Sequence, residues 1–287
     1  HCSIGWRLMG HRLLAKTLVV GALTLGAVSV PAGATVTPTS YMTFNIAGAA
    51  GAPYTTADHS NSITSGDPYL RQQHAMPIVY IAQASQPTGI AVQEDCDNTD
   101  PNITDAREYL MWELVSRGYQ YFGVSTKTLT TRHCVQGTWI FAKGTYAWAD
   151  YLWLPGTTEG ESRAAVCMRT VVFVQVANCS SHLTTAAGDQ QQQSFSFWAF
   201  AEQQVPYSFA VWSGGDFNTN NLNVLYPWPT NSSEGDTTLA RNTFGSKKID
   251  YSWGRLPIGQ AAGGSVVAGA PNYSDHNYVF APFNWVY

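Results

Sequence analysis

The sequence predicts an α+β fold in which two β-sheets pack face to face and helices cover the outside. Short apolar runs typical of buried strands recur along the chain, with three helix-like segments between them. This mixed order of strands in runs and separate helices fits two packed sheets. No internal repeat or linker divides residues 35–287, so we expect a single domain there.

Nine apolar runs are expected to form the strands. They lie at residues 41–46, 89–94, 119–124, 138–142, 164–170, 172–178, 207–212, 248–253 and 278–281. Residues 47–68 are rich in Gly, Ala, Ser and Thr, and residues 221–246 are rich in Asn, Thr and Pro, so both segments are expected to be loops.

Three segments are expected to be helices. The first covers about residues 76–85, because Pro77 suits the first turn of a helix. The second covers residues 105–116, with Thr104 as its N-terminal cap. The third covers residues 188–204.

The beginning of the chain is typical of a secretory signal. Its basic residues are Arg7, Arg12 and Lys16. An apolar run at residues 18–30 and the small residues at 32–34 follow, as in a cleaved signal peptide. We therefore expect residues 1–34 to be removed, leaving a secreted, extracellular protein of residues 35–287. Met9 is a candidate start, and the apolar run is too short to predict a transmembrane anchor.

The cysteines predict two disulfide bonds. The four that follow the signal are Cys96, Cys134, Cys167 and Cys179. An even number in a secreted chain is typical of disulfide pairing. Cys167 and Cys179 lie in adjoining strand-like runs, so we pair them and leave Cys96 with Cys134. None of the four has the Cys-x-x-Cys spacing of a zinc site.

The charge balance argues against a strongly basic binding surface. The formal net charge is −4 at pH 7. Residues 1–34 contain three basic and no acidic residues, so their removal makes the remaining chain more negative. Lys247-Lys248 is the only adjacent basic pair in residues 35–287. A phosphate-containing substrate would therefore need a bound cation to supply much of the positive charge.

One stretch combines a buried strand with polar residues at its end. The apolar run 207–212 is followed by Gly214 and Gly215, where the backbone can turn sharply or let a ligand come close. Asp216 and Asn218 come next, and on extended backbone residues two apart point to the same side. An acid beside an amide suits a water molecule or a metal-bound phosphate oxygen, although a strand followed by an Asx turn explains the stretch equally well.

Other apolar strands also end in polar groups. These are Asn45, Glu94, His182, Asp250 and the pair Asp275-His276. Each alone is more often a structural residue. Burying all of them without a purpose would be costly, and a shared cation would relieve the repulsion among the carboxylates. We therefore predict one common site.

Six short motifs carry a resemblance to a known family. In chain order they are Phe44-Asn45-Ile46, Val92-Gln93-Glu94, Ser181-His182-Leu183, Gly215-Asp216-Phe217-Asn218, Lys248-Ile249-Asp250-Tyr251 and Ser274-Asp275-His276. Together they span nearly all of residues 35–287, and the chain resembles the endonuclease/exonuclease/phosphatase family, of which deoxyribonuclease I is the best-known type. The resemblance implies a four-layer α/β/β/α sandwich of two mixed sheets and metal-dependent cleavage of phosphate esters.

The resemblance also implies a role for the metal ligands and the base. Glu94 would bind Mg²⁺ directly, with Mn²⁺ or Ca²⁺ as alternatives, and Asn45 and Asp275 would hold the metal or its waters. His276 would be the general base that takes a proton from the attacking water. Asp250 would orient that imidazole and stabilise its charge.

The resemblance implies that three further residues position the attacking water and bind the phosphate. By the same resemblance, Asp216 and Asn218 would position both for in-line attack. His182 would hydrogen-bond a phosphate oxygen or assist the leaving group. The abasic-site endonuclease branch of the family usually has Asn in the place of His182 and is intracellular.

The resemblance therefore favours a secreted, non-specific endonuclease or general phosphodiesterase, acting on nucleic acid as a monomer. The alternative is a sphingomyelinase or a lipid or inositol phosphatase, which would bind a lipid headgroup and need an exposed aromatic hairpin. A third reading, from another class, is a catalytically silent binding or toxin subunit. The occupied catalytic positions argue against that reading.

Several aromatic residues have no assigned place. They are Tyr146, Trp148, Tyr151, Trp153 and the Tyr226-Pro227-Trp228-Pro229 loop. They could contact a membrane or stack on bases, although aromatic residues more often fill the core of a sandwich or pack a loop.

Overall fold

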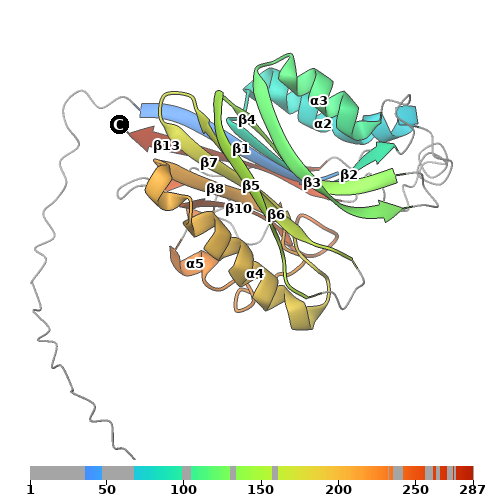
Figure 1. Ribbon diagram of the computed structural model, residues 1–287, viewed down its shortest axis with the longest axis vertical. Coiled ribbons are helices and arrows are strands. Elements are labelled where there is room, and N and C mark those ends of the chain that lie inside the picture. Colours follow the sequence, from blue (N-terminus) through green and yellow to red (C-terminus); the bar gives the residue numbers. More distant parts are fainter. Residues whose placement is uncertain are drawn as a thin grey trace, which may run out of the picture. The chain divides into compact units, whose positions relative to one another are not determined.

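Four layers of secondary structure build the protein (Figure 1). The computed structural model describes residues 36–46, 68–98, 105–129, 134–156, 161–231, 233–234, 242–255, 261–262, 266–269, 274 and 276–286. Helices α2 (Pro68–Ser85) and α3 (Ala106–Val115) cover one sheet, and α4 (Ala187–Glu202) and the short α5 (Trp228–Asn231) cover the other. The predicted α+β fold, a four-layer α/β/β/α sandwich, is confirmed.

The first sheet has seven strands. They are β1 (Val36–Asn45), β2 (Gly89–Asn98), β3 (Tyr119–Leu129), β4 (Cys134–Lys143), β11 (Ala261–Ala262), β12 (Val266–Gly269) and β13 (Asn277–Val286). Their order is β11-β13-β1-β2-β4-β3, and β12 also pairs with β13. β1 runs parallel to β2 and antiparallel to β13, so the sheet is mixed as expected.

The second sheet has six strands in the order β5-β6-β7-β8-β10-β9. They are β5 (Thr145–Trp153), β6 (Ala164–Val171), β7 (Gln175–His182), β8 (Ala210–Asp216), β9 (Ser233–Glu234) and β10 (Asp250–Arg255). β7 and β8 are parallel, and the other pairs are antiparallel. β5, at the edge, is not among the predicted strands.

Three hydrophobic cores separate the four layers. Between the seven-stranded sheet and α2 and α3 lie buried residues such as Phe44, Ile78 and Leu110. Residues of both sheets, among them Tyr41, Ile140, Val166 and Trp212, meet in the middle core. α4 packs Phe197 and Phe200 onto the outer face of the six-stranded sheet. Burial of both faces explains the long apolar runs of the central strands.

Helix α2 begins earlier than predicted. Pro77 lies inside this helix rather than in its first turn. A proline in this place removes one backbone hydrogen bond, but Ala75 before it and Ile78 and Val79 after it are buried in the core under the helix. Tertiary packing therefore continues the helix across a residue that usually ends one.

Helix α3 has a different cap from the expected one. The Asp105 side chain accepts a hydrogen bond from the Ala106 backbone N at 2.7 Å, and Glu108 Oε2 accepts one from the Asp105 N at 3.1 Å. The Asp105 side chain also accepts from the backbone N of Glu108, and this contact together with the Glu108 contact to the Asp105 N forms a capping box. Asp105 therefore caps the helix, while the expected cap, Thr104, lies outside the described residues.

One of the two predicted disulfides is present. Cys167 and Cys179 face each other on β6 and β7 and are bonded, which confirms this pairing. Cys96 and Cys134 lie on the neighbouring strands β2 and β4, but their side chains are outside what the structure describes, so their pairing stays a prediction. The predicted signal at residues 1–34 also lies outside the described residues. Among the described helices, we find none with the length and apolar character needed to cross a bilayer.

Candidate functional site

The register of the strands brings the predicted polar residues to one edge of the sandwich. In the six-stranded sheet, His182 at the end of β7 pairs with Asp216 at the end of β8, and Asp216 pairs with Asp250 at the start of β10. In the other sheet, Asn45 ends β1 beside β2, which carries Glu94. Strands far apart in the sequence thus deliver side chains to a single place.

The two strands that carry His182 and Asp216 come very close at Gly215. A Cβ atom added there would lie 2.1 Å from the carbonyl oxygen of Ser181 on β7. The absent side chain therefore makes room for the neighbouring strand, and not for a ligand as the sequence suggested.

Asn45 links the two sheets through carboxylates. Its Nδ2 lies 3.0 Å from Glu94 Oε1 and 3.0 Å from Asp216 Oδ2. Gln136 Nε2 also donates to Glu94 Oε2, at 3.3 Å. Asn45 is fully buried. Because one amide group holds an acid from each sheet, the relative position of the two sheets sets the geometry of the acidic pair.

A backbone irregularity aims Glu94 at the cluster. The pairing of β2 with β4 shifts between Gln93 and Asp95, and Glu94 has a φ of +56°, in the left-handed region. The neighbouring Asp95 is held by the buried Arg107, with an Nε to Oδ2 distance of 2.5 Å, and Arg107 Nη1 also contacts Asp97 Oδ2 at 2.7 Å. This ion-pair network holds the strand on the far side of the bulge in place.

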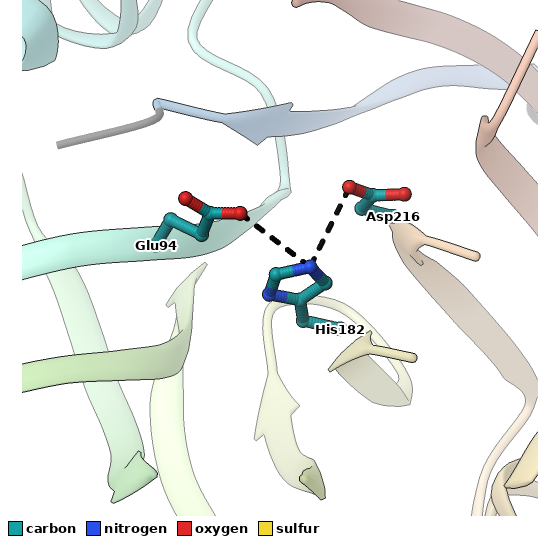
Figure 2. A group of neighbouring side chains, drawn as sticks. All are labelled: Glu94, His182 and Asp216. Atoms are coloured by element: carbon teal, nitrogen blue, oxygen red, sulfur yellow. Dashed lines mark ion pairs between the residues drawn. The ribbon is translucent and has the colours of Figure 1, made fainter. Parts of the chain in front are cut away.

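His182 lies between the two acids (Figure 2). Its Nε2 is 3.5 Å from Glu94 Oε1 and 3.6 Å from Asp216 Oδ2. Its Nδ1 is 2.8 Å from Arg163 Nη1. A guanidinium can only donate, so Nδ1 accepts and the ring proton is on Nε2. Burial, and then the positive charge of Arg163, lower the pKa of His182 well below its usual value, so the ring is neutral at physiological pH.

His276 has the opposite arrangement of ring nitrogens. Its Nδ1 is 2.9 Å from Asp250 Oδ2, and its Nε2 is 3.8 Å from Asp216 Oδ2. The Asp250 carboxylate accepts, so the proton is on Nδ1 and Nε2 is a proton acceptor. The backbone N of His276 donates to Ser274 Oγ at 3.0 Å, and Ser274 Oγ donates to the Asn45 carbonyl at 2.7 Å. These contacts hold the imidazole at the edge of the cluster.

Asp216 lies close to both imidazoles of the site, those of His182 and His276. Burial, and then the nearby Asp250 carboxylate, raise its pKa to about 7, while His276, Asn45 and the backbone N of Asn218 oppose this shift. Without a further positive charge, this carboxyl therefore takes up a proton more readily than an ordinary aspartate. A bound cation would favour its ionised form.

Asn218 does not follow the extended backbone that the sequence suggested. Its φ is +52°, so alternation along a strand does not apply to it. Its backbone N donates to Asp216 Oδ1 at 2.7 Å, and its Nδ2 donates to the Leu183 carbonyl at 2.8 Å. Asn218 thus contacts Asp216 through its backbone, and its side chain ties the loop to the end of β7.

The side chains present fit a hard divalent cation. The ligand atoms of Glu94, His182 and Asp216 lie within 4.8 Å of one another, and so do those of Asp216, Asp250 and His276. Carboxylate oxygens are the ligands that Mg²⁺, Mn²⁺ and Ca²⁺ prefer. Asp250 Oδ1 is buried without a hydrogen-bond partner among the described residues, so this oxygen is an acceptor open to a ligand. Asp275, the remaining predicted ligand, lies outside the described residues.

Two residues of the site were not predicted. Arg163 fixes the proton on His182, and Gln136 donates to Glu94. Each lies one or two residues before an apolar run in the sequence, at 164–170 and 138–142. A single Arg or Gln next to a strand is too common to indicate a function, so only the folded arrangement identifies them.

Several solved structures have the same architecture as this chain. An endonuclease/exonuclease/phosphatase protein from Beutenbergia cavernae matches with a TM-score of 0.63 and 16% identity, over 86% of this chain and 71% of that one. The human Nocturnin catalytic domain, with a bound sulfate anion, matches with a TM-score of 0.62 and 16% identity, over 87% and 97%. TDP2 from D. rerio, complexed with a single-strand DNA product, matches with a TM-score of 0.57 and 15% identity, over 86% and 99%.

The chain has the endonuclease/exonuclease/phosphatase fold. No family model and no curated protein matches its sequence. The resemblance drawn from six short motifs is thus confirmed at the level of the fold. Within the endonuclease/exonuclease/phosphatase fold of this chain, all the predicted polar residues that the structure describes lie at the same edge of the two sheets.

Proposed function

We propose that the protein is a divalent-metal-dependent phosphodiesterase that hydrolyses nucleic acid by in-line attack of water. The observation that carries this proposal is the pair of buried imidazoles on either side of Asp216. His182 presents an N–H at Nε2, and His276 presents a proton acceptor at Nε2. One donor and one acceptor around an acidic cluster is the arrangement that a phosphate ester and an attacking water require.

His276 is the general base in this proposal. Its Nε2 takes a proton from the attacking water, and the positive charge that forms on the ring is stabilised by Asp250 at Nδ1. Asp216 accepts a hydrogen bond from the same water and orients it toward the phosphorus. The backbone of Asn218 holds the Asp216 carboxylate for this role.

In this proposal, His182 binds the phosphate group of the substrate. Its Nε2–H donates to a non-bridging oxygen or to the leaving oxygen, and Arg163 keeps the ring in the required tautomer. Glu94, with Asn45 and Asp275, would hold the cation, for which Mg²⁺ is the first choice and Mn²⁺ or Ca²⁺ the alternatives. A bound divalent cation supplies positive charge that offsets the negative charge building on the phosphate oxygens.

Nucleic acid is the proposed substrate, and the extracellular space the proposed location. Among the similar structures, that of TDP2 holds a single-strand DNA product and that of Nocturnin a sulfate anion, and both support a site for phosphate-like groups. The signal-like residues 1–34 support secretion. We propose a monomeric, non-specific endonuclease of the deoxyribonuclease I type.

A lipid substrate has less support. The exposed apolar turn between β6 and β7 contains Val172 and Phe173, with Phe173 72% exposed. β7 runs from this turn to His182, so the turn lies at the far end of the strand from the cluster. A membrane held by this turn would not present its headgroups to His182. The β6–β7 turn is thus not an aromatic hairpin beside the site, as the sphingomyelinase alternative would require.

A hydrolysis assay with purified protein tests the proposal. We expect cleavage of DNA with Mg²⁺, no cleavage with EDTA, and no cleavage by the His276→Ala and Asp216→Ala variants that keep the wild-type circular dichroism spectrum. If the wild-type protein hydrolyses sphingomyelin and no DNA, the lipid alternative replaces the proposal. If it hydrolyses neither of these nor bis-p-nitrophenyl phosphate, the silent-subunit reading replaces it.

A further inference from the structure

Two large aromatic rings are exposed on the edge strand β5. Tyr151 is 44% exposed and Trp153 is 47% exposed. Their ring centroids are 5.7 Å apart at an interplanar angle of 82°. Neither ring belongs to the three hydrophobic cores. An exposed pair of packed aromatic residues is a common feature of binding surfaces.

The strand register places Trp153 in one row with the candidate site. Trp153 pairs with Ala164 on β6. Ala165 pairs with Ser181, so Ala164 lies beside His182 at the end of β7. Residues that face each other across strands have their side chains on the same side of the sheet. Trp153 therefore points to the same face of the six-stranded sheet as His182.

The distance along this row suits a neighbouring nucleotide. β5 and β7 are separated by β6 alone, so Trp153 and His182 are about two strand spacings, or roughly 10 Å, apart along the sheet. Tyr151 lies on the same face two residues earlier in β5. A nucleic-acid strand with a phosphate at His182 can reach these rings with a base close to that phosphate.

Two cations near this row, among the residues that the structure describes, are already paired. Arg163 Nη2 lies 2.8 Å from Glu161 Oε2, and Lys127 is ion-paired with Glu161 Oε1. The whole chain has only 15 Lys and Arg residues against 19 Asp and Glu. Contacts with phosphates can thus supply little of the affinity for a nucleic acid. Stacking of bases on aromatic rings is the other main source of affinity in proteins that bind single strands.

We infer that Tyr151 and Trp153 form a stacking subsite for an unpaired nucleobase of the strand whose phosphate is bound at the cluster. This inference rests on the proposed function and narrows its substrate to single-stranded or locally unpaired nucleic acid. In a duplex, neighbouring base pairs cover the faces of each base, so the two rings have no partner there. The subsite adds binding energy without adding positive charge.

The test compares Trp153→Ala with Tyr146→Ala. Tyr146 is a matched control because it is 53% exposed on the same strand but pairs with Thr170, at the other end of β5 from Trp153. The measured quantity is the ratio of kcat/KM for single-stranded DNA to kcat/KM for bis-p-nitrophenyl phosphate, which has no nucleobase. We expect Trp153→Ala to lower this ratio by about tenfold or more, Trp153→Phe to restore most of it, and Tyr146→Ala to match the wild type.

The outcomes separate this inference from the proposed function. If the wild-type protein cleaves neither substrate, the proposed function fails. If it cleaves both and Trp153→Ala keeps the wild-type ratio, only the stacking subsite is wrong. A loss of binding to sphingomyelin vesicles with an unchanged ratio would also overturn the subsite and assign the rings to a membrane. Should Trp153→Ala not fold, Tyr151→Ser is judged by the same ratio.

Discussion

His276 Nδ1 donates to Asp250 Oδ2 across the interface of the two sheets, at 2.9 Å. His276 directly precedes β13 in the seven-stranded sheet, and Asp250 begins β10 in the six-stranded sheet. The hydrogen bond therefore sets both the tautomer of the imidazole and its place above Asp216. In the proposed mechanism it determines whether Nε2 can accept a proton.

Asp250→Asn tests this role of the carboxylate. The amide can donate to His276 Nδ1 and move the ring proton to Nε2, so we expect kcat to fall by about 10²- to 10⁴-fold with a smaller change in KM. Steady-state kinetics on DNA measure the effect. Asp150→Asn, an exposed acid on β5, is the control and should keep wild-type kcat. An Asp250→Asn enzyme with more than half of the wild-type kcat would rule out this role.

Arg163→Met should raise the pKa of His182. The guanidinium is the second cause of its low pKa, after burial, because it repels a positive ring and donates to Nδ1. The pKa of His182 should therefore rise in the variant but stay below its usual value, because the ring is still buried. An NMR titration of the ring, assigned with His182→Gln, measures it. Arg117→Met, which removes a surface ion pair with Glu113, is the control, and an unchanged pKa in Arg163→Met would contradict the hydrogen bond.

Asp216 should make the stability of the metal-free protein depend on pH. Its pKa is about 7 in the folded protein, against an ordinary aspartate pKa of 3.8. Because the folded pKa is the higher one, its contribution to the free energy of unfolding is complete below about pH 4 and is lost as pH rises through 7. Asp216→Asn lacks this titration. We expect the Tm of the wild type minus that of the variant to fall between pH 4 and pH 8 in differential scanning fluorimetry.

Mg²⁺ should restore the stability that the metal-free protein loses as pH rises. Its binding favours the ionised form of Asp216, so Mg²⁺ should raise the wild-type Tm more at pH 8 than at pH 5. Asp216→Asn should show a smaller increase at pH 8. An equal increase in both proteins at both pH values would place the cation away from Asp216.

Arg107 should be important for stability as well as for the position of Glu94. Arg107 and Asp95 have only 5% and 2% of their side chains exposed. Arg107→Met leaves a buried carboxylate without its partner, so we expect a loss of about 3–5 kcal/mol in the free energy of unfolding. Arg117→Met, at a more exposed pair, should cost about 0.5 kcal/mol or less. Urea denaturation measures the free energy of unfolding of both variants. Equal decreases in the two variants would contradict a stabilising role for the buried ion-pair network.

The thiol count tests the second disulfide. If Cys96 and Cys134 are bonded as Cys167 and Cys179 are, protein of residues 35–287 purified without reductant should have no free thiol after denaturation. Two reactive thiols would contradict the predicted pairing of Cys96 with Cys134.

Part of the site could be predicted from the sequence because Asn45, His182 and Asp216 end strands. The expectation that Asp250 and His276 also end strands is wrong, because Asp250 begins β10 and His276 directly precedes β13. His182 and Asp216 both follow buried runs, and the carboxyl ends of parallel strands meet at one edge. The two-sheet architecture follows from the same runs. Prediction succeeded where one local pattern, a strand followed by a polar residue, determines position.

The remaining features depend on contacts between distant segments. Asn218 has a left-handed backbone that its loop imposes, and extended geometry is wrong for it. Arg163 acts on the site through His182, 19 positions away. β5 has aromatic residues on both faces and lies at a sheet edge, so it lacks the simple alternation of a half-buried strand. No local pattern contains this information.

The amide of Asn45 holds one carboxylate from each sheet. Neither sheet alone contains the complete set of groups, so no fragment of the chain that lacks one sheet can be active. Recovery of catalysis during refolding should consequently report the docking of the two halves of the sandwich, later than any signal from secondary structure. If the proposed function holds, the return of turnover would therefore measure the rate of that last step of folding.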